Sequence, residues 1–494
     1  MAAGKYSRKL KLTEQVKRKE TDYLGEVSIP ADALYGIHAW RSAENFPGQT
    51  PFQPEWYRAL GIVKLACYQT IMAFRSAALL KYPPEKLPAG TEDGSLFEAL
   101  ALAAEEVSLG KYAEHFIVPA MQGGAGTSAN MNMNEILSNV ALLKLGYCPG
   151  EYRYVHPIAH ANLFQSTNDV MPTALKVALM QLLGRLEDSI NNLRASVESR
   201  EKTHRHHLRI AYTQMQQAVP SSYGMLFGAY SDALSRDWWR VSKCLERIKV
   251  VNLGGGATGS GMAIPRYFVM EVATRLQKLT NLPLARGDNL SDTTQNLDSL
   301  VEVHAILKSH AVNLEKIAAD LRLLSSELHG KPELSIPARQ TGSSIMPGKV
   351  NPVIPEFVIG SVHKVYSNDV LVSSLCGQAC LDLNAYLPVI GHAMIDSLNL
   401  LINAGSSLQQ NLLTGFRLDA GKALENLLNS PSISTALIPH TGYEKAAELA
   451  QYMTAHSCSV FEANKKLRIL PDPKLKEILQ PEELLKLGYS LAGL

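Results

Sequence analysis

The segment Thr341–Pro352 holds the densest set of side chains in this sequence that could do chemistry. It reads Thr-Gly-Ser-Ser-Ile-Met-Pro-Gly-Lys-Val-Asn-Pro. Its two glycines allow backbone conformations that other residues avoid, and its two prolines fix the chain at set points. The polar residues between them are Ser343, Ser344, Lys349 and Asn351. A serine hydroxyl can act as a base, the lysine ammonium group can bind an anion, and the asparagine amide can both donate and accept hydrogen bonds. We predict a closing catalytic loop rather than an ordinary turn, because a solvated loop rarely carries three large apolar side chains as well.

Two further stretches have small polar side chains directly before an apolar helical pattern. Gly123–Asn134 reads as a glycine-rich turn that leads into a helix, and Gln165–Asp169 precedes a helix predicted over residues 172–204. A helix start binds anions because its unpaired amides point outwards and the helix dipole is positive there. Asn and Ser also cap helices, so capping is the alternative for both stretches. Two such starts in one chain favour a dicarboxylate bound between them.

The composition is that of an ordinary globular protein, with 494 residues, 46% of them hydrophobic and 19% charged. A net charge of +2 implies no polyelectrolyte partner, so we expect no nucleic-acid binding. The basic first twenty residues lack the apolar region of a secretory signal, and no run of about eighteen apolar residues predicts a membrane span. Six scattered cysteines indicate reduced thiols and a cytoplasmic location. No Cys/His spacing is typical of zinc, and we expect no metal and no cofactor.

Apolar residues at helical spacing predict long helices over most of the chain. The clearest stripe lies in 297–324, where apolar side chains recur on one face. Similar stripes cover about 55–80, 95–115, 221–250, 262–280, 353–375 and 386–413. Helices of roughly 25–35 residues, each about 40–50 Å long, would make a long bundle. Beyond about residue 416 the predicted helices shorten. We therefore expect an N-terminal mixed and helical domain (1–160), a central bundle (161–415) and a small C-terminal helical domain (416–494).

The glycine-rich segment Gly254–Gly261 suggests a phosphate-binding loop at first sight. It lacks the Gly-Lys-Ser/Thr ending of such a loop, and no strand is predicted beside it. We interpret it as a tight link between two bundle helices.

Four stretches of the chain resemble the active-site segments of the fumarase/aspartase superfamily, in the same order and at similar separations. They are Gly123–Glu135, Gln165–Asp169, Thr213–Pro220 and the G-S-S-x-x-P-x-K-x-N pattern within 342–351. The resemblance runs from about Asp22 to about Ser490 and is closest to the aspartase branch. It implies a mainly α-helical, three-domain fold whose long central helices build a tetrameric helical core. It also implies a homotetramer whose active sites are shared between subunits.

The family catalyses reversible elimination to give fumarate. A base takes a proton beside a carboxylate, which doubles the negative charge there, so the site must hold preorganised donors. The resemblance implies that Thr127, Ser166 and Thr213 surround this carboxylate. It implies that Lys349 and Asn351 hold the other carboxylate, helped by Thr167 and Asn168. Arg41 matches a family arginine near the active site, and a surface salt bridge is the alternative for it.

By the same resemblance, Ser343 is the base. A serine hydroxyl is a poor base in water. It becomes effective only if loop closure removes water and surrounds its oxygen with amide donors and a cation. Closure of the loop would then also gate turnover.

Position 214 separates the reactions of the family. Fumarase-type members resemble Thr-His here, whereas this chain has Thr213-Gln214. Glutamine does not titrate near neutral pH, but its carbonyl oxygen can accept a hydrogen bond from an ammonium group. The sequence therefore favours an ammonia-lyase that converts L-aspartate to fumarate and ammonia. Glu356 could bind the leaving amine or be a helix-start carboxylate.

Several positions depart from the aspartase pattern. Tyr212 replaces the family's arginine before Thr213, and Met225 and Trp40 add further bulk. These residues could shape a pocket for a larger, less polar amine, or they could lie away from the substrate. The family's His-Pro-Asn-Asp-His segment is altered at 156–160, so we do not expect an accessory anion site there. A lyase for another amine, a fumarate hydratase and a non-catalytic helical protein remain the alternatives.

Overall fold

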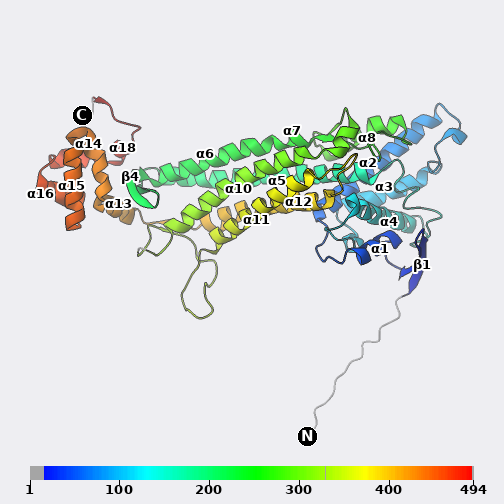
Figure 1. Cartoon of the computed structure of the whole chain (residues 1–494), viewed down its shortest axis with the longest axis horizontal. Helices are drawn as coiled ribbons and strands as arrows, with labels where there is room; N and C mark the ends of the chain where they lie inside the picture. The colour runs from blue at the N-terminus through cyan, green and yellow to red at the C-terminus, as the bar shows by residue number, and fades with distance from the viewer. Residues whose placement is uncertain (1–15, 329, 492–494) are drawn as a thin grey trace, which may run out of the picture. The chain divides into compact units, whose positions relative to one another are not determined.

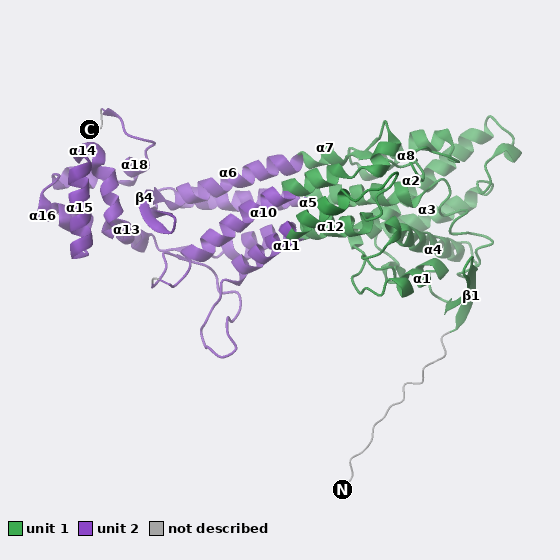
Figure 2. Cartoon of the chain, viewed as in Figure 1, with its two compact units in different colours: residues 1–184, 243–306, 367–399 green, residues 185–242, 307–366, 400–494 purple. Residues whose placement is uncertain are grey.

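The computed structural model describes residues 16–328 and 330–491, so most of the predicted basic N-terminal tail lies outside the described residues. The described chain is mainly helical, and the strands found in it form two-stranded sheets (Figure 1). Contacts divide the chain into two compact units. Unit 1 comprises residues 1–184, 243–306 and 367–399, and unit 2 comprises 185–242, 307–366 and 400–494 (Figure 2).

Unit 1 combines an N-terminal hairpin with packed helices. Its elements are β1 (Lys17–Asp22), β2 (Gly25–Pro30), α1 (Ile37–Asn45), α2 (Pro54–Leu79), α3 (Gly94–Ser108), α4 (Thr127–Lys144), α7 (Cys244–Ile248), β5 (Val250–Val251), α8 (Arg266–Thr280), β6 (Ala285–Arg286) and α9 (Leu290–Gln295). Short 3-10 turns cover Pro84–Lys86, Ala113–His115 and Gly124–Gly126. Helix α2 packs against α3 and α8, and α4 packs against α1 and α3. Most of helix α4 from Ala129 to Leu142 is buried, and its first residue, Thr127, remains exposed.

Unit 2 contains the C-terminal helices and a β-hairpin. Its elements are β3 (Leu208–Thr213), β4 (Gln216–Ser222), α6 (Tyr223–Ser242), β7 (Leu334–Ser335), β8 (Arg417–Leu418), α13 (Ala420–Asn429), α14 (Ile438–Thr441), α15 (Tyr443–His456), α16 (Val460–Leu467), α17 (Asp472–Ile478) and α18 (Pro481–Leu484), with a 3-10 helix at Pro431–Leu437 and a π-helix at Leu408–Leu413. Four long helices have residues in both units: α5 (Thr167–Thr203), α10 (Asp298–Leu324), α11 (Val353–Cys376) and α12 (Leu387–Ser407).

The long helices predicted from apolar spacing are present, but α5 begins five residues earlier than predicted. Pro172 lies inside its first turns rather than at its start. A proline there lacks the N–H that would pair with the carbonyl of Asn168. The side chain of Asn252 donates to that carbonyl instead, at 2.9 Å. The helix can therefore begin before the proline, because a residue distant in the sequence replaces the missing donor.

The prediction of almost continuous helix from residue 172 to 415 is wrong at 208–222. This segment is an antiparallel hairpin in which Leu208 pairs with Ser222 and Thr213 pairs with Gln216. Leu208 and Ile210 are buried in an apolar cluster with C-terminal residues such as Leu427 and Leu449. Tertiary packing against the C-terminal helices therefore fixes a hairpin whose own sequence alternates poorly.

One apolar stretch of the described chain is long enough to cross a membrane, Leu387–Leu413, which comprises α12 and the π-helix after it. Two thirds of its most apolar window is buried inside the protein. This burial is typical of a core helix.

The first turn of α1 is held by a buried carboxylate from α4. Glu135 Oε2 accepts from the N–H groups of Gly36 and Ala39, at 2.8 and 3.2 Å, and its Oε1 accepts from that of His38 at 2.8 Å. Burial raises the pKa of Glu135 to about 8, although the three backbone donors favour the ionised form. Glu135 thus satisfies three of the donors that this helix start leaves open and ties α1 to α4, while the N–H of Ile37 donates to Glu20 Oε2 at 2.8 Å.

We predict that Glu135→Gln loosens α1, because the amide group would face backbone N–H donors. The free energy of unfolding should fall by about 2–4 kcal/mol, as for other buried charged hydrogen-bond partners. Hydrogen exchange of a peptide covering residues 34–46 should become faster. The matched control is Glu98→Gln on the exposed side of α3. Equal exchange rates in the two variants would contradict this role of Glu135.

Candidate active site

The residues predicted to form the site divide between the two units. Unit 1 contains Arg41, Thr127, Ser166, Thr167 and Asn168. Unit 2 contains Tyr212, Thr213, Gln214, Ser343, Lys349, Asn351 and Glu356.

In unit 1, the starts of α4 and α5 lie side by side. Thr127 is the first residue of α4, and Asn130 lies one turn further along it. The Asn130 amide donates to the hydroxyl oxygen of Thr167, the first residue of α5, at 3.1 Å. Gly126, which precedes α4, has φ +91°, a conformation that favours glycine. Two positive helix ends therefore meet at one place, as expected for an anion site.

The other polar residues of α4 are not helix caps. Asn130, Asn132 and Asn134 are buried, and each hydrogen bonds to another segment. The Ser128 hydroxyl hydrogen bonds to that of Ser42 on α1. The capping alternative is therefore wrong for these residues of α4, because their side chains turn into the core rather than back to the helix end.

A buried carboxylate orders the turn that contains Ser166, Thr167 and Asn168. Asp169 Oδ1 accepts from the N–H of Ser166 at 2.9 Å. Its Oδ2 accepts from the N–H groups of Gly254 and Gly256, at 3.1 and 2.9 Å. Burial raises the pKa of Asp169 to about 6. The Ser166 hydroxyl accepts from the N–H of Asn168 at 3.2 Å, so Ser166 does act as a cap while its O–H group can still donate.

The Gly254–Gly261 segment is a loop bound to this turn. The side chain of Asn168 donates to the carbonyl of Ala257 at 2.8 Å. A two-residue strand, β5, comes shortly before the loop and pairs in parallel with β6, so the prediction of no neighbouring strand is wrong. The next helix, α8, does not begin until Arg266. The loop therefore braces the start of α5 rather than leading directly into a helix as a phosphate-binding loop does.

Arg41 is engaged within unit 1. Its guanidinium donates to both carboxylate oxygens of Asp22, at 2.8 and 2.9 Å. This hydrogen-bonded pair lowers the pKa of Asp22. The interaction matches the salt-bridge alternative for Arg41, and a substrate carboxylate would have to compete with Asp22 for the same donors.

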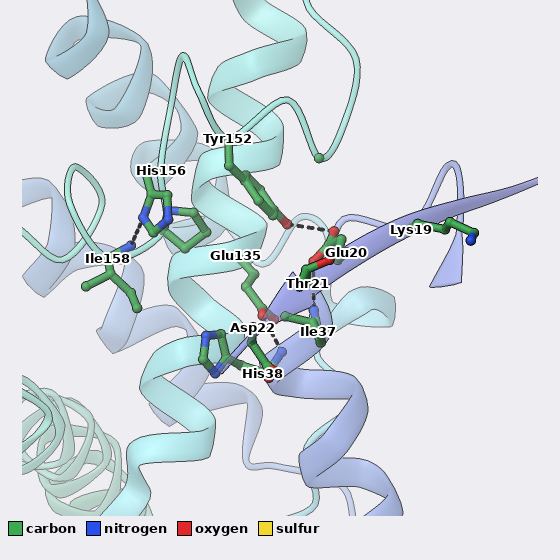
Figure 3. Close-up of a pocket in the computed structure, with 12 residues that line it drawn as sticks. Lys19, Glu20, Thr21, Asp22, Ile37, His38, Glu135, Tyr152, His156 and Ile158 are labelled. Atoms are coloured by element: carbon green, nitrogen blue, oxygen red, sulfur yellow. Dashed lines mark hydrogen bonds between the residues drawn. The ribbon is translucent and has the colours of Figure 1, made fainter. Parts of the chain in front are cut away.

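A small cavity of about 190 Å³ lies beside this pair, and Figure 3 shows its lining side chains. Three of them are carboxylates, from Glu20, Asp22 and Glu135. The ring of His156 accepts from the N–H of Ile158, and burial lowers the pKa of this histidine. Lys19 lines the same cavity, so the carboxylates have a cation beside them. That the altered 156–160 segment forms no accessory anion site stays a prediction.

In unit 2, the loop around Ser343 surrounds the serine oxygen with amide donors. Ser343 Oγ accepts from the backbone N–H groups of Ile345 and Met346, at 3.2 and 3.0 Å. Two N–H donors on one oxygen stabilise negative charge on that oxygen. The loop thus has the local geometry of a nest for an alkoxide.

The two ends of the loop are joined by hydrogen bonds. The N–H of Gly342 donates to the carbonyl of Lys349 at 2.8 Å, and the Asn351 side chain donates to the carbonyl of Gly342 at 2.7 Å. A Cβ at Gly342 would lie 2.8 Å from the backbone nitrogen of Asn351, so only glycine fits. The loop lines a hollow of about 320 Å³ that includes Ser343 and Lys349. The Lys349 side chain is exposed beside it.

Thr213 and Gln214 occupy the tip of the β3–β4 hairpin. Gln214 and Met215 form the two-residue turn, with φ values of +51° and +61°. Both values lie in the left-handed region, where hairpin turns usually place Asn or Gly. Non-glycine residues there cost free energy and are frequent at functional sites. The turn projects Thr213 and Gln214 into solvent, supported by the C-terminal helices that pack against the hairpin.

Four residues were predicted either to shape the leaving-group pocket or to lie away from it or at a helix start. Tyr212 is 46% exposed on β3, and Met225 is exposed on α6. Glu356 lies in the first turn of α11 with an Arg322 nitrogen 3.5 Å away, which fits its helix-start interpretation. Trp40 lies in unit 1, where its indole N–H donates to Glu44. Among the described residues, no group of three or more His, Cys, Asp or Glu side chains could hold a metal ion.

Sequence reasoning missed the buried support of this site. Lys64 and Asn162 hydrogen bond to the asparagines of α4, and Asp169 orders the α5 start. A lysine within the otherwise apolar run of α2, Gly61–Tyr68, was the available signal, because such a position is normally buried.

The fold and the four polar segments identify the class of the protein. The family described as Lyase matches residues 25–367, and the family described as Fumarase C C-terminus matches residues 433–486. The chain belongs to the fumarase/aspartase superfamily of lyases.

Individual relatives agree with this membership. An aspartate ammonia-lyase from a Bacillus species is 37% identical over 96% of this chain and 98% of its own length. A solved fumarate lyase/delta crystallin from Brucella melitensis is 35% identical, with a TM-score of 0.86 over 94% of this chain and 99% of that one. A class II fumarase from Schistosoma mansoni is 26% identical, with a TM-score of 0.84 over 95% of this chain and 99% of that one.

We predict that Asp169→Asn releases the 254–261 loop, because an amide cannot accept from all three backbone donors. The free energy of unfolding should fall by about 2–4 kcal/mol. Hydrogen exchange in peptides covering 252–262 should accelerate. The exposed Asp288→Asn serves as the control. Loop protection equal to that of the wild type would show that Asp169 does not hold it.

Proposed function

We propose that this chain is a carbon–nitrogen lyase that eliminates ammonia from L-aspartate to give fumarate. The observation that carries the proposal is the Ser343 oxygen, which two backbone N–H groups already surround. A histidine at position 214 would favour activation of water, whereas Gln214 offers an acceptor for an ammonium group. The similarity to aspartate ammonia-lyases supports the same choice.

The reaction would proceed in two steps. Ser343, as an alkoxide, takes a proton from Cβ of aspartate, and the electron pair of the C–H bond moves into the adjacent carboxylate. The resulting dianionic aci-carboxylate is stabilised by hydroxyl donors from Thr127, Ser166 and Thr213. The electron pair then forms the Cα–Cβ double bond while the Cα–N bond breaks, and ammonia leaves.

The second carboxylate would bind at Lys349 and Asn351, with Thr167 and Asn168 as further donors. In this proposal, the polarised Thr167 hydroxyl is one of the donors best suited to an anion, because it already accepts from Asn130. Arg41 would contribute from its pairing with Asp22, and Glu356 would contribute near the leaving amine. No cofactor or metal is needed for these steps.

We further propose a cytoplasmic homotetramer built on the long helices, with active sites shared between subunits and three domains at 1–160, 161–415 and 416–494. Apolar side chains exposed on α6, α10 and α11 support such an assembly. They include Trp239, Val312, Leu323, Phe357 and Val370. The six cysteines form no disulfide in the described chain, which supports the location.

A lyase for a different amine is the second candidate, because Tyr212 is a large, half-exposed side chain next to Thr213. Addition of a panel of amines to fumarate separates the two candidates by which amine is consumed. Formation of malate from fumarate would instead indicate a hydratase.

We predict that Ser343→Ala lowers kcat for fumarate formation by at least about 10³-fold, as expected for loss of an essential base. Binding of succinate, a dicarboxylate that cannot eliminate, should change less than about threefold. Fumarate absorbance and titration calorimetry measure the two effects.

The matched control is Ser344→Ala, which removes the neighbouring exposed hydroxyl. Activity of Ser343→Ala equal to that of this control would refute the base assignment. Absence of fumarate from wild-type enzyme and aspartate would refute the substrate.

A shared site predicts complementation between two inactive variants. Ser343→Ala and Thr167→Val, coexpressed with different tags, should recover activity in mixed tetramers, because about a quarter of the sites then contain both wild-type segments when two chains mix at random. Light scattering on the mixed species should give about four times the 54.0 kDa chain mass. Inactive mixed tetramers would show that both residues of a site come from one subunit.

A further inference from the structure

A lysine lies entirely inside unit 1, within hydrogen-bond distance of α4 and of the segment before α5. Lys64 is on α2 and has 0% of its surface exposed. Its ammonium group donates to Asn134 Oδ1 at 2.6 Å and to Asn162 Oδ1 at 3.2 Å. No ion pair between Lys64 and a carboxylate is found in the part of the chain that the structure describes. Lysine is almost never fully buried without a charged partner, so this position calls for a reason.

The amides that Lys64 contacts lead directly to Thr167. Asn162 Oδ1 also accepts from the side-chain amides of Asn130 and Asn134, each at 3.1 Å. The second N–H of the Asn130 amide donates to the Thr167 hydroxyl oxygen at 3.1 Å. Because this oxygen accepts, its own O–H is left to donate, and the chain of hydrogen bonds polarises it.

The same network fixes the turn before α5. Asn162 Nδ2 donates to the carbonyl of Gln165 at 3.1 Å. Asn130 Oδ1 is buried and has no hydrogen-bond partner among the described residues. Two of the three N–H donors of Lys64 have a partner in the described residues, and the network is open at one acceptor next to Thr167.

The electrostatic surroundings of Lys64 indicate that its charge favours the binding of an anion. The positive ends of α4 and α5 meet near this network, so an added buried cation is unfavourable while the site is empty. A methionine would fill the same space without that cost. When a dianion is bound, the buried charge of Lys64 becomes favourable, because the dianion is attracted by both helix ends and by the ammonium group.

We propose that Lys64 is a positioning residue of the anion site: through Asn162 and Asn130 it holds and polarises the Thr167 hydroxyl, and its buried charge raises the affinity for a dicarboxylate. This inference rests on the proposed function, in which Thr127 contacts one carboxylate of the substrate and Thr167 contacts the other. Lys64 itself touches no substrate atom.

A proton-linked binding reaction follows. Desolvation lowers the pKa of Lys64 to about 7, so more than half of the population is neutral above that pH. The two titratable groups whose charge acts on it are Cys67, one turn along α2, and Asp169 at the start of α5. Burial raises the pKa of the Cys67 thiol and that of Asp169, the latter to about 6, so in the free enzyme near pH 8 the thiol is protonated and Asp169 is ionised. Burial also raises the pKa of Glu135 to about 8, so the uptake that belongs to Lys64 is the part lost when this lysine is replaced. A dianion bound nearby raises the pKa of Lys64, and binding must then take up a proton.

The test is titration of the full-length enzyme with succinate near pH 8, in two buffers of different ionisation enthalpy. Wild type should take up a fraction of a proton per site. In Lys64→Met, uptake from this residue should disappear, and the dissociation constant for succinate should rise about 10–100-fold, the effect of one nearby charge. The control is Lys81→Met, which removes an exposed lysine just beyond α2.

Each outcome is decisive. Unchanged succinate affinity and proton uptake in a folded Lys64→Met overturn the proposal. If that variant does not fold, absence of proton uptake by wild type overturns it instead. Failure of wild type to bind succinate at all removes the anion site and this role of Lys64 together. Succinate binding with the expected linkage, but no ammonia released from aspartate, would reject the proposed reaction and leave the role of Lys64 standing.

Discussion

The structure of unit 1 depends on buried ionisable side chains that hydrogen bond to backbone and amide groups instead of to counter-ions. Glu135 and Asp169 each accept from three backbone N–H groups, and Lys64 donates to two amide oxygens. Burying an ion costs several kcal/mol unless its hydrogen bonds are complete, which restricts each partner to one position. The ends of α1, α4 and α5 are therefore fixed where ordinary apolar packing would allow small shifts.

Rigid ends of this kind suit a reaction that builds charge. Stabilisation of an aci-carboxylate requires donors that are in place before the charge appears, because reorganisation during the reaction would cost part of the gain. Thr127 and Thr167 are the first residues of their helices, and Asn130 links the two. The asparagines of α4 thus connect the buried charge to the hydroxyls that would contact a substrate.

Most of the long helices could be predicted from the sequence, but the buried hydrogen bonds that hold the candidate site could not. Apolar spacing predicted the long helices, since a helix that buries one face must repeat at 3.6 residues. The start of α5 was misplaced because the donor that replaces the missing N–H of Pro172 comes from Asn252. The hairpin at 208–222 was missed because its burial depends on C-terminal helices. Lys64 gave little signal, because a lone lysine says nothing of which amides will surround it. These hydrogen-bond partners are brought together by the tertiary structure, and a local sequence pattern carries no information about them.

The loop around Ser343 differs from the buried part of the site, because the proposed chemistry requires a site without water and the loop is largely exposed. Ile345 is 84% exposed and Met346 is 48% exposed, and Lys349 is exposed beside them. Full burial of an exposed apolar side chain yields about 1.5–3 kcal/mol, and Met346, which is already half-buried, would yield about half of that. Closure of the loop over a bound dicarboxylate would release that free energy and offset the desolvation of Lys349, whose charge the anion would neutralise. If the loop closes as proposed, these apolar side chains would stabilise the closed form, and the two N–H groups on the Ser343 oxygen would stabilise its negative charge once water had left.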